Sequence, residues 1–242
     1  MARPKELAFV LTRSTGMPSA IDIIGYAAEL GIRLDDRTAR EFAIAQRGSL
    51  LISHARVPYP DADSKPTGLL SPSAEQLGTA TSHLMLVGFD LRGSAPERDA
   101  LMYRLTAAVV RATDAVAVVN HGANVFRSDV FASLAELAVD QASIPVELSI
   151  SITATSSGQR TVLLTQGMAR FGREELCVTC SPTGRGGYQF VYDIARWMLA
   201  EPRPRVLTGE TIGRTSDERI VVQRIRHPAQ PKLTVIKLDL VD

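Results

Sequence analysis

The sequence predicts an α+β fold in which mixed sheets carry helices packed on them. Two observations support this: strand-like and helix-like segments alternate along the 242 residues, and the pattern passes twice through strand, helix and hairpin. A chain of this length can bury roughly 70% of its unfolded surface. We therefore expect a single domain over residues 1–242, with a division into two related lobes, 1–122 and 123–242, as the alternative.

Apolar patterning predicts the strands of the first half of the chain. The run from His83 to Leu91 is apolar on both faces, so it should lie centrally in a sheet. Ser94-Ala95-Pro96-Glu97 is a capping box with proline in the first turn, which predicts the start of a long helix. An earlier helix should bury Ile21, Ile24 and Ala28. The expected strands are 7–11, 42–45, 49–57, 83–91 and 115–119.

The second half should begin with a helix near Ser128, reached directly from strand 115–119 through a polar turn. A hairpin is expected around Ser156-Ser157-Gly158-Gln159. The stretch from Thr165 to Cys180 predicts a turn, a short helical turn and then a strand, because two glycines frame apolar residues three apart. The remaining expected elements are strands 146–153, 161–165, 220–225 and 233–240, and a helix over 188–199.

Composition limits the classes of partner. Lys plus Arg total 27 against 26 Asp plus Glu, so the formal charge of +1 gives no general reason to bind nucleic acid or an anionic membrane. No stretch approaches the roughly 20 apolar residues that cross a bilayer, and two cysteines do not make a disulfide framework. We expect a cytoplasmic protein with a protein partner, and homo-oligomers remain open.

Three motifs, in order, carry a resemblance: Gly167 to Leu176, Tyr192 to Ala195, and Gly209 to Gly213. Together with segments 7–11 and 117–123 they resemble the signature series of the bacterial domain of unknown function 4261 family, over nearly the whole chain. That family has no established chemistry, so the resemblance implies no cofactor. This chain departs from it by Asn120-His121, where the family tends to carry an aromatic residue, and by Cys177, where it usually has an acid.

A shorter similarity lies in Thr165 to Met168 and in Glu175-Leu176. These residues are similar to the suppressor-of-fused family, whose bacterial members are often inferred to be immunity proteins that neutralise toxins. By resemblance, a charged interaction surface is expected on residues of the central motif, although a solvated and internally paired face would give the same pattern. Its members are Arg170, Phe171, Arg173, Glu174 and Glu175.

Cys177 and Cys180 have the spacing of a metal or redox pair. Zinc needs four ligands, and residues three apart on a strand point to opposite faces. A redox cysteine would favour a helix N-terminus, whereas Cys177 falls within an expected strand. We therefore expect two buried structural thiols and no metal.

Two turns could hold a ligand. Gly184, Arg185 and Gly186 lie between a strand and a helix, where backbone N–H groups can bind an anion, although such glycines also permit a tight turn. Asn120 and His121 follow a buried strand, and His121 is a weak candidate for a catalytic base, with a structural turn histidine as the alternative.

No template for catalysis fits the sequence. The leading interpretation is a non-catalytic bacterial protein-binding module, with neutralisation of a toxin or effector as its more specific version. The alternative is an enzyme that binds a small molecule or nucleotide through the His121 turn and the loop from Gly184 to Gly187.

Overall fold

The computed structural model describes residues 6–38, 40–45, 47–60, 70–120, 124–141, 145–182, 185–200, 206–213 and 215–240. Within them the chain forms six α-helices and fourteen strands, with helices packed against the sheets, so the predicted α+β fold class is confirmed. The chain divides into two compact units, Met1–Leu148 (unit 1) and Ser149–Asp242 (unit 2). This boundary lies well after the division at 122/123 considered from the sequence. No helix of the described residues has the length and apolarity that a bilayer crossing requires.

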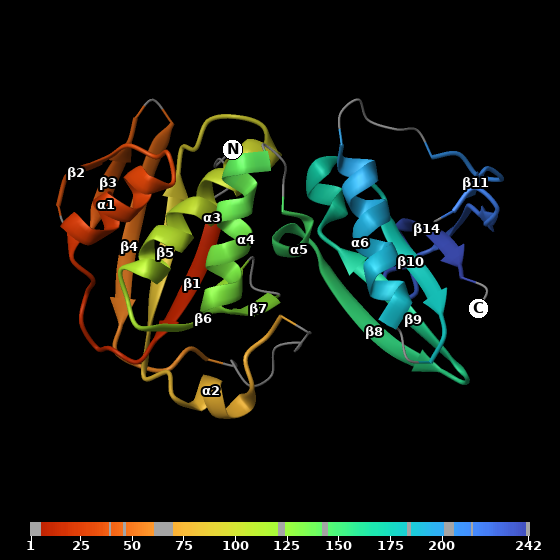
Figure 1. The fold of residues 1–242 in the computed structure, drawn as a ribbon, viewed down its shortest axis with the longest axis horizontal. Coiled ribbons are helices and arrows are strands. Elements are labelled where there is room, and N and C mark those ends of the chain that lie inside the picture. Colours follow the sequence, from red (N-terminus) through yellow and green to blue (C-terminus); the bar gives the residue numbers. More distant parts are fainter. Residues whose placement is uncertain are drawn as a thin grey trace. The chain divides into compact units, whose positions relative to one another are not determined.

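Unit 1 is built on a seven-stranded sheet (Figure 1). Its strands are β1 (Glu6–Thr12), β2 (Leu34–Asp36), β3 (Glu41–Ile44), β4 (Gly48–Ala55), β5 (Ser82–Phe89), β6 (Ala115–Asn120) and β7 (Asn124–Arg127). They lie in the order β2-β3-β4-β5-β1-β6-β7, and every neighbouring pair is antiparallel. β5 therefore occupies the central position that its two apolar faces predicted.

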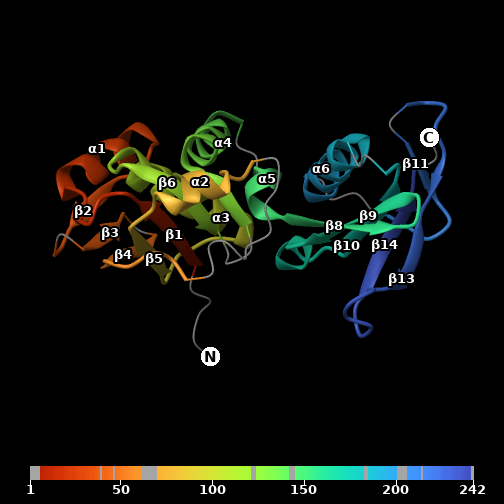
Figure 2. The same ribbon diagram turned by 90° about the horizontal axis from the view of Figure 1, so that it is seen from below.

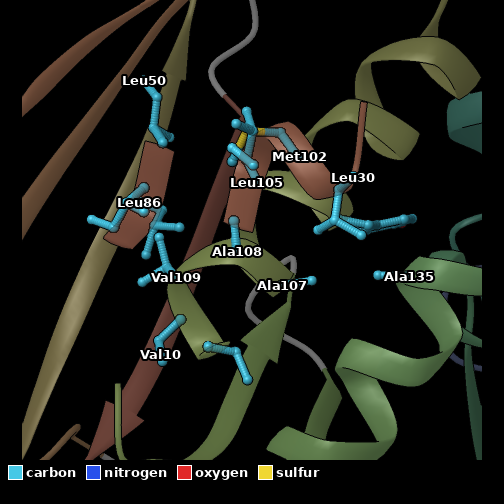
Figure 3. Packing of buried hydrophobic residues seen from close by; sticks show 14 of the residues in the cluster. Val10, Leu30, Leu50, Leu86, Met102, Leu105, Ala107, Ala108, Val109 and Ala135 are labelled. Atoms are coloured by element: carbon cyan, nitrogen blue, oxygen red, sulfur yellow. The ribbon is translucent and has the colours of Figure 1, made fainter. Parts of the chain in front are cut away.

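Three helices cover one face of this sheet: α1 (Ala20–Glu29), α3 (Ala95–Arg111) and α4 (Ser128–Gln141). Figure 3 shows Leu105, Ala108 and Val109 of α3 beside Val10 and Leu86 of the sheet, and all five are fully buried. Burial of each leucine stabilises the fold by about 1.5–3 kcal/mol. The predicted capping box starts α3, because the side chains of Ser94 and Glu97 each bond the backbone of the other.

The opposite face of the sheet carries the short helix α2 (Ala74–Gly78). Leu77 and Ala80 pack there against Leu11, Ala117 and Val119. The sheet is thus apolar on both sides, but only one side is covered by long helices (Figure 2).

The buried stripe of α1 differs from the prediction. Ile21 is 80% exposed and Ala28 is exposed, so these two members of the expected stripe were wrong, whereas Ile24 is partly buried against the core. The residues that face the core are spaced four and three apart, which is also a helical face. They are Ile23, Ala27 and Leu30.

Unit 2 contains a five-stranded sheet with one helix across it (Figure 1). Its strands are β8 (Ser151–Ser157), β9 (Arg160–Gln166), β10 (Glu175–Cys180), β13 (Gln223–Arg226) and β14 (Thr234–Asp239), and its helix is α6 (Arg185–Leu199). The order is β13-β14-β10-β9-β8, with β10 and β14 parallel and the other pairs antiparallel. β11 (Thr211–Ile212) and β12 (Ile220–Val221) form a separate two-stranded sheet.

Three segments differ from the sequence prediction. Val146–Ser149 is the short helix α5, so the strand expected from 146 starts only at Ser151. β7 intervenes between β6 and α4, where a direct passage from strand to helix was expected. The closing strand 220–225 is divided into β12 and β13 because Val222 lies between them. Pattern alone missed these features because each involves only two to four residues.

Gly187 allows α6 to lie close to the sheet of unit 2. A Cβ at this position would come within 2.5 Å of the Cys180 sulfur and 2.9 Å of Leu163 Cδ1. Val191 and Met198 of α6 are buried.

We expect Gly187→Ala to destabilise unit 2 by about 1–3 kcal/mol, because the added methyl group overpacks this contact. Gly25→Ala in α1 is the control, since a Cβ there meets nothing within 4 Å and should stabilise its helix by about 0.5–1 kcal/mol. Chemical denaturation of both variants measures the difference. Equal effects of the two substitutions would contradict the close packing of α6.

Candidate functional site

Asn120 ends β6 and its side chain is already engaged. The residue is buried, pairs with Ala8 of β1 and Asn124 of β7, and donates from Nδ2 to the Leu148 carbonyl oxygen at 2.7 Å. This bond holds α5 against the end of the sheet. His121 lies outside the described residues.

The expected setting of this turn, between a strand and a helix, was wrong. β6 and β7 form an antiparallel pair, so residues 121–123 connect two strands. The argument that functional groups gather at the carboxyl ends of parallel strands does not apply to an antiparallel sheet.

The glycine-rich loop before α6 belongs to unit 2, whereas Asn120 belongs to unit 1. Gly184 and the side chain of Arg185 lie outside the described residues, and Gly186 is exposed in the first turn of α6. The following glycine, Gly187, has a packing reason, which is its contact with Cys180.

Glu175, one of the predicted surface residues, is buried inside unit 2. Its carboxylate accepts hydrogen bonds from Thr165 Oγ1 at 2.7 Å, from the Gly167 N–H at 2.9 Å and from the Ala169 N–H at 3.1 Å. Thr165 Oγ1 in turn accepts from the Leu176 N–H at 2.7 Å. The carboxylate thus fixes the turn that leads into the 3₁₀ helix Met168–Phe171.

The other residues of the predicted surface divide between the interior and the exterior. Phe171 is buried, Arg170 is exposed, and Arg173 is partly buried. The Nε and Nη2 atoms of Arg173 are enclosed and have no hydrogen-bond partner in the part of the chain that the structure describes. Glu174 pairs with Arg224, whose Nε and Nη2 atoms donate to the carboxylate at 2.8–3.1 Å. The structure therefore places only part of this set where a partner could touch it.

The Glu174–Arg224 pair closes a contact between three segments of unit 2. Arg224 also donates to Thr208 Oγ1 at 2.8 Å and to the Val206 carbonyl oxygen at 2.6 Å. The hydrogen bonds to Glu174 raise the pKa of Arg224, so the guanidinium stays charged. Glu174 and Arg224 thus have a structural role within unit 2, which accounts for their charges without a binding partner.

Cys177 and Cys180 are buried thiols on β10 that form no disulfide with one another. Cys180 donates to the Thr161 carbonyl oxygen at 3.5 Å and lies under α6, while Cys177 is three residues away on the opposite face. Burial raises the pKa of Cys177, which keeps it protonated. The described residues contain no group of three His, Cys, Asp or Glu side chains that could hold a metal ion.

The edges of the two sheets differ in how they are protected from other strands. β2 has three residues, two of them exposed aspartates, and β13 carries the exposed cation Arg226 beside the paired Arg224. β7 is covered, because the Arg127 N–H donates to the Leu70 carbonyl oxygen and Ser71 Oγ donates to that of Val125. Short length, charge and coverage are the usual means of blocking an edge.

β8 has none of these protections. It runs for seven residues, Ser-Ile-Thr-Ala-Thr-Ser-Ser, without a charge, a proline or a glycine, and Thr153 to Ser156 are exposed. Among the described residues, no backbone hydrogen bond joins β8 to a segment other than β9. This edge, which sequence reasoning did not single out, is left open to pairing by the described residues of unit 2.

The hairpin geometry determines which groups of β8 point outward. The turn Gly158–Gln159 is of type II′, with Gly158 at φ 61°, and closes on the pair Ser157 and Arg160. In an antiparallel ladder, hydrogen-bonded and non-hydrogen-bonded pairs alternate from such a closing pair. The N–H and C=O groups that point away from β9 are therefore those of Ile152, Ala154 and Ser156.

The chain matches no protein-family model, and searches of curated proteins and of solved structures returned no match. The assignment of a function therefore depends on the residues described above.

We expect Glu175→Ala to destabilise unit 2 by about 3 kcal/mol, because it leaves the buried Thr165 hydroxyl and the partly buried Gly167 and Ala169 N–H groups without their acceptor. Glu174→Ala is the matched control: this neighbouring carboxylate is 35% exposed, and its ion pair should contribute less than about 1 kcal/mol. Urea denaturation measures both, and equal losses would contradict the structural role of Glu175.

His54 should make stability depend on pH. Burial, followed by Arg56, His83 and Arg40, lowers its pKa below the ordinary value of 6.5, and its buried Nε2 atom has no hydrogen-bond partner among the described residues. The unfolded chain therefore takes up the proton first, so the free energy of unfolding falls as the pH falls through 6.5. His54→Leu should reduce the loss between about pH 7.5 and about pH 5.5, measured by urea denaturation. An unchanged pH dependence would contradict this assignment.

Proposed function

We propose that this protein is a non-catalytic protein-binding module that binds a partner by adding a strand to the free edge of β8. In strand addition an extended segment pairs with an exposed sheet edge, and main-chain hydrogen bonds supply much of the affinity. The observation that carries the proposal is the seven-residue, uncharged β8 edge beside three edges that are blocked.

The chemistry of the edge defines the partner. The N–H and C=O groups of Ile152, Ala154 and Ser156 would pair with an extended segment, and the side chains of Thr153 and Thr155 would lie against its neighbours on the open face. A partner segment rich in β-branched and small polar residues fits this edge. β8 carries no charge that would attract a highly charged segment.

The sequence resemblances extend the proposal. The motifs that resemble the bacterial domain of unknown function 4261 family, and the local similarity to the suppressor-of-fused family, favour a bacterial binding protein whose partner is a toxin or effector. The two cysteines, which are not joined in a disulfide, favour the cytoplasm as its location. No described residue favours the alternative enzyme, since Asn120 uses its amide for Leu148 and Gly187 has a packing role.

The test is isolation of the tagged full chain from its own host, with and without Ala154→Pro. Proline removes the outward N–H of Ala154 while the bonds to β9 remain, because that N–H points away from β9. We expect a stoichiometric partner with the wild-type protein and a loss of roughly tenfold or more in the captured amount with the variant.

Gln223→Lys on β13, the opposite edge of the same sheet, is the control and should capture as much partner as the wild type. The proposal is wrong if no partner is captured, or if Ala154→Pro captures as much as the wild type. Thermal unfolding of each variant verifies that it is folded.

A further inference from the structure

The sequence of β8 is nearly the same in both directions. Around Ala154 it runs Ser-Ile-Thr on one side and Thr-Ser-Ser on the other. Antiparallel pairing of two copies about a two-fold axis at Ala154 would place Thr153 opposite Thr155 of the other copy, and Ile152 opposite Ser156. Self-complementarity of this kind is what a two-fold symmetric interface requires.

The direction of the backbone groups fits this register. Ala154 has its N–H and C=O directed outward, so the two Ala154 residues can exchange both hydrogen bonds at the axis. Ile152 and Ser156 also point outward and face one another across the axis. Thr153 and Thr155 then form non-hydrogen-bonded pairs, in which side chains lie closest and Thr–Thr contacts are favourable.

Neither charge nor the helix layer opposes this pairing. β8 has no ionisable side chain, and the formal charge of the whole chain is only +1. α6 packs mainly over β9 and β10, so it lies one or two strands away from the edge. Directly opposed residues point to the same side, so the α6 helices of both copies would lie on the same face of the joined sheet.

We propose that two copies of this chain pair through β8, so that their five-stranded sheets join into one continuous sheet when no partner is bound. This inference rests on the proposed function, because it assigns a second copy to the same binding edge. Dimerisation covers an edge that would otherwise promote aggregation, and a partner strand then competes with the second copy for β8. One strand pair is a small interface, so we expect a monomer–dimer equilibrium in the micromolar range.

The test uses the charge pattern that the register predicts, with the full chain measured by sedimentation equilibrium over a concentration series. In the variant Thr153→Lys with Thr155→Lys, lysines would face lysines across the axis, and we expect dimerisation to weaken by roughly tenfold or more. In Thr153→Lys with Thr155→Glu, each lysine would face a glutamate, and dimerisation should return to the wild-type strength or exceed it.

The outcomes separate this inference from the proposed function. The inference is wrong if the wild-type chain stays monomeric at about 100 μM, or if the double-lysine variant dimerises as strongly as the wild type. It is also wrong if the lysine–glutamate variant is as weak as the double-lysine variant while both remain folded. The proposed function fails separately, when partner capture is absent or insensitive to Ala154→Pro, whatever the oligomeric state.

Discussion

Every strand of a sheet must satisfy its backbone N–H and C=O groups, and the seven-stranded and five-stranded sheets of this protein are organised by that constraint. Within each sheet the ladders satisfy the central strands, so the remaining demand falls on four edge strands. Coverage by Leu70 and Ser71 meets it at β7, and charge limits pairing at β2 and β13. The described residues leave the outward N–H and C=O groups of β8 to bond solvent or another chain. This difference from the other edges is why we place the binding site at β8.

The same constraint explains the residues of the central motif. The turn before the 3₁₀ helix Met168–Phe171 leaves N–H groups that no strand can satisfy, and the carboxylate of Glu175 accepts two of them. Gly167, at φ 125°, lies so close to the Ser149 carbonyl oxygen that a Cβ would come within 2.7 Å of it. A cluster of charged and glycine residues that suggested an interaction surface is thus largely the means by which one turn is held.

The sequence was sufficient where a signal is repeated along an element or is chemically specific. The two-sided apolar pattern of β5, the capping box of α3 and the glycine turn between β8 and β9 each predicted the observed element. It was insufficient where only a few residues determine the structure. β7 has four residues, and the buried face of α1 differs from the predicted one because Ile23 is buried and Ile21 is exposed. The free edge of β8 could be recognised only from the order of the strands in the sheet. A sequence does not show which strand of a hairpin pairs with a further strand.

The contact between Gly187 and Cys180 has a consequence for observing the protein in motion. The Cys180 thiol is 2% exposed and is covered by the first turn of α6, so a thiol reagent can reach it only when that helix separates from the sheet. Cys177, on the other side of the same strand, is 3% exposed and is not covered by α6. The rates at which the two thiols are alkylated therefore report separately on the opening of the two faces of unit 2, without any added probe.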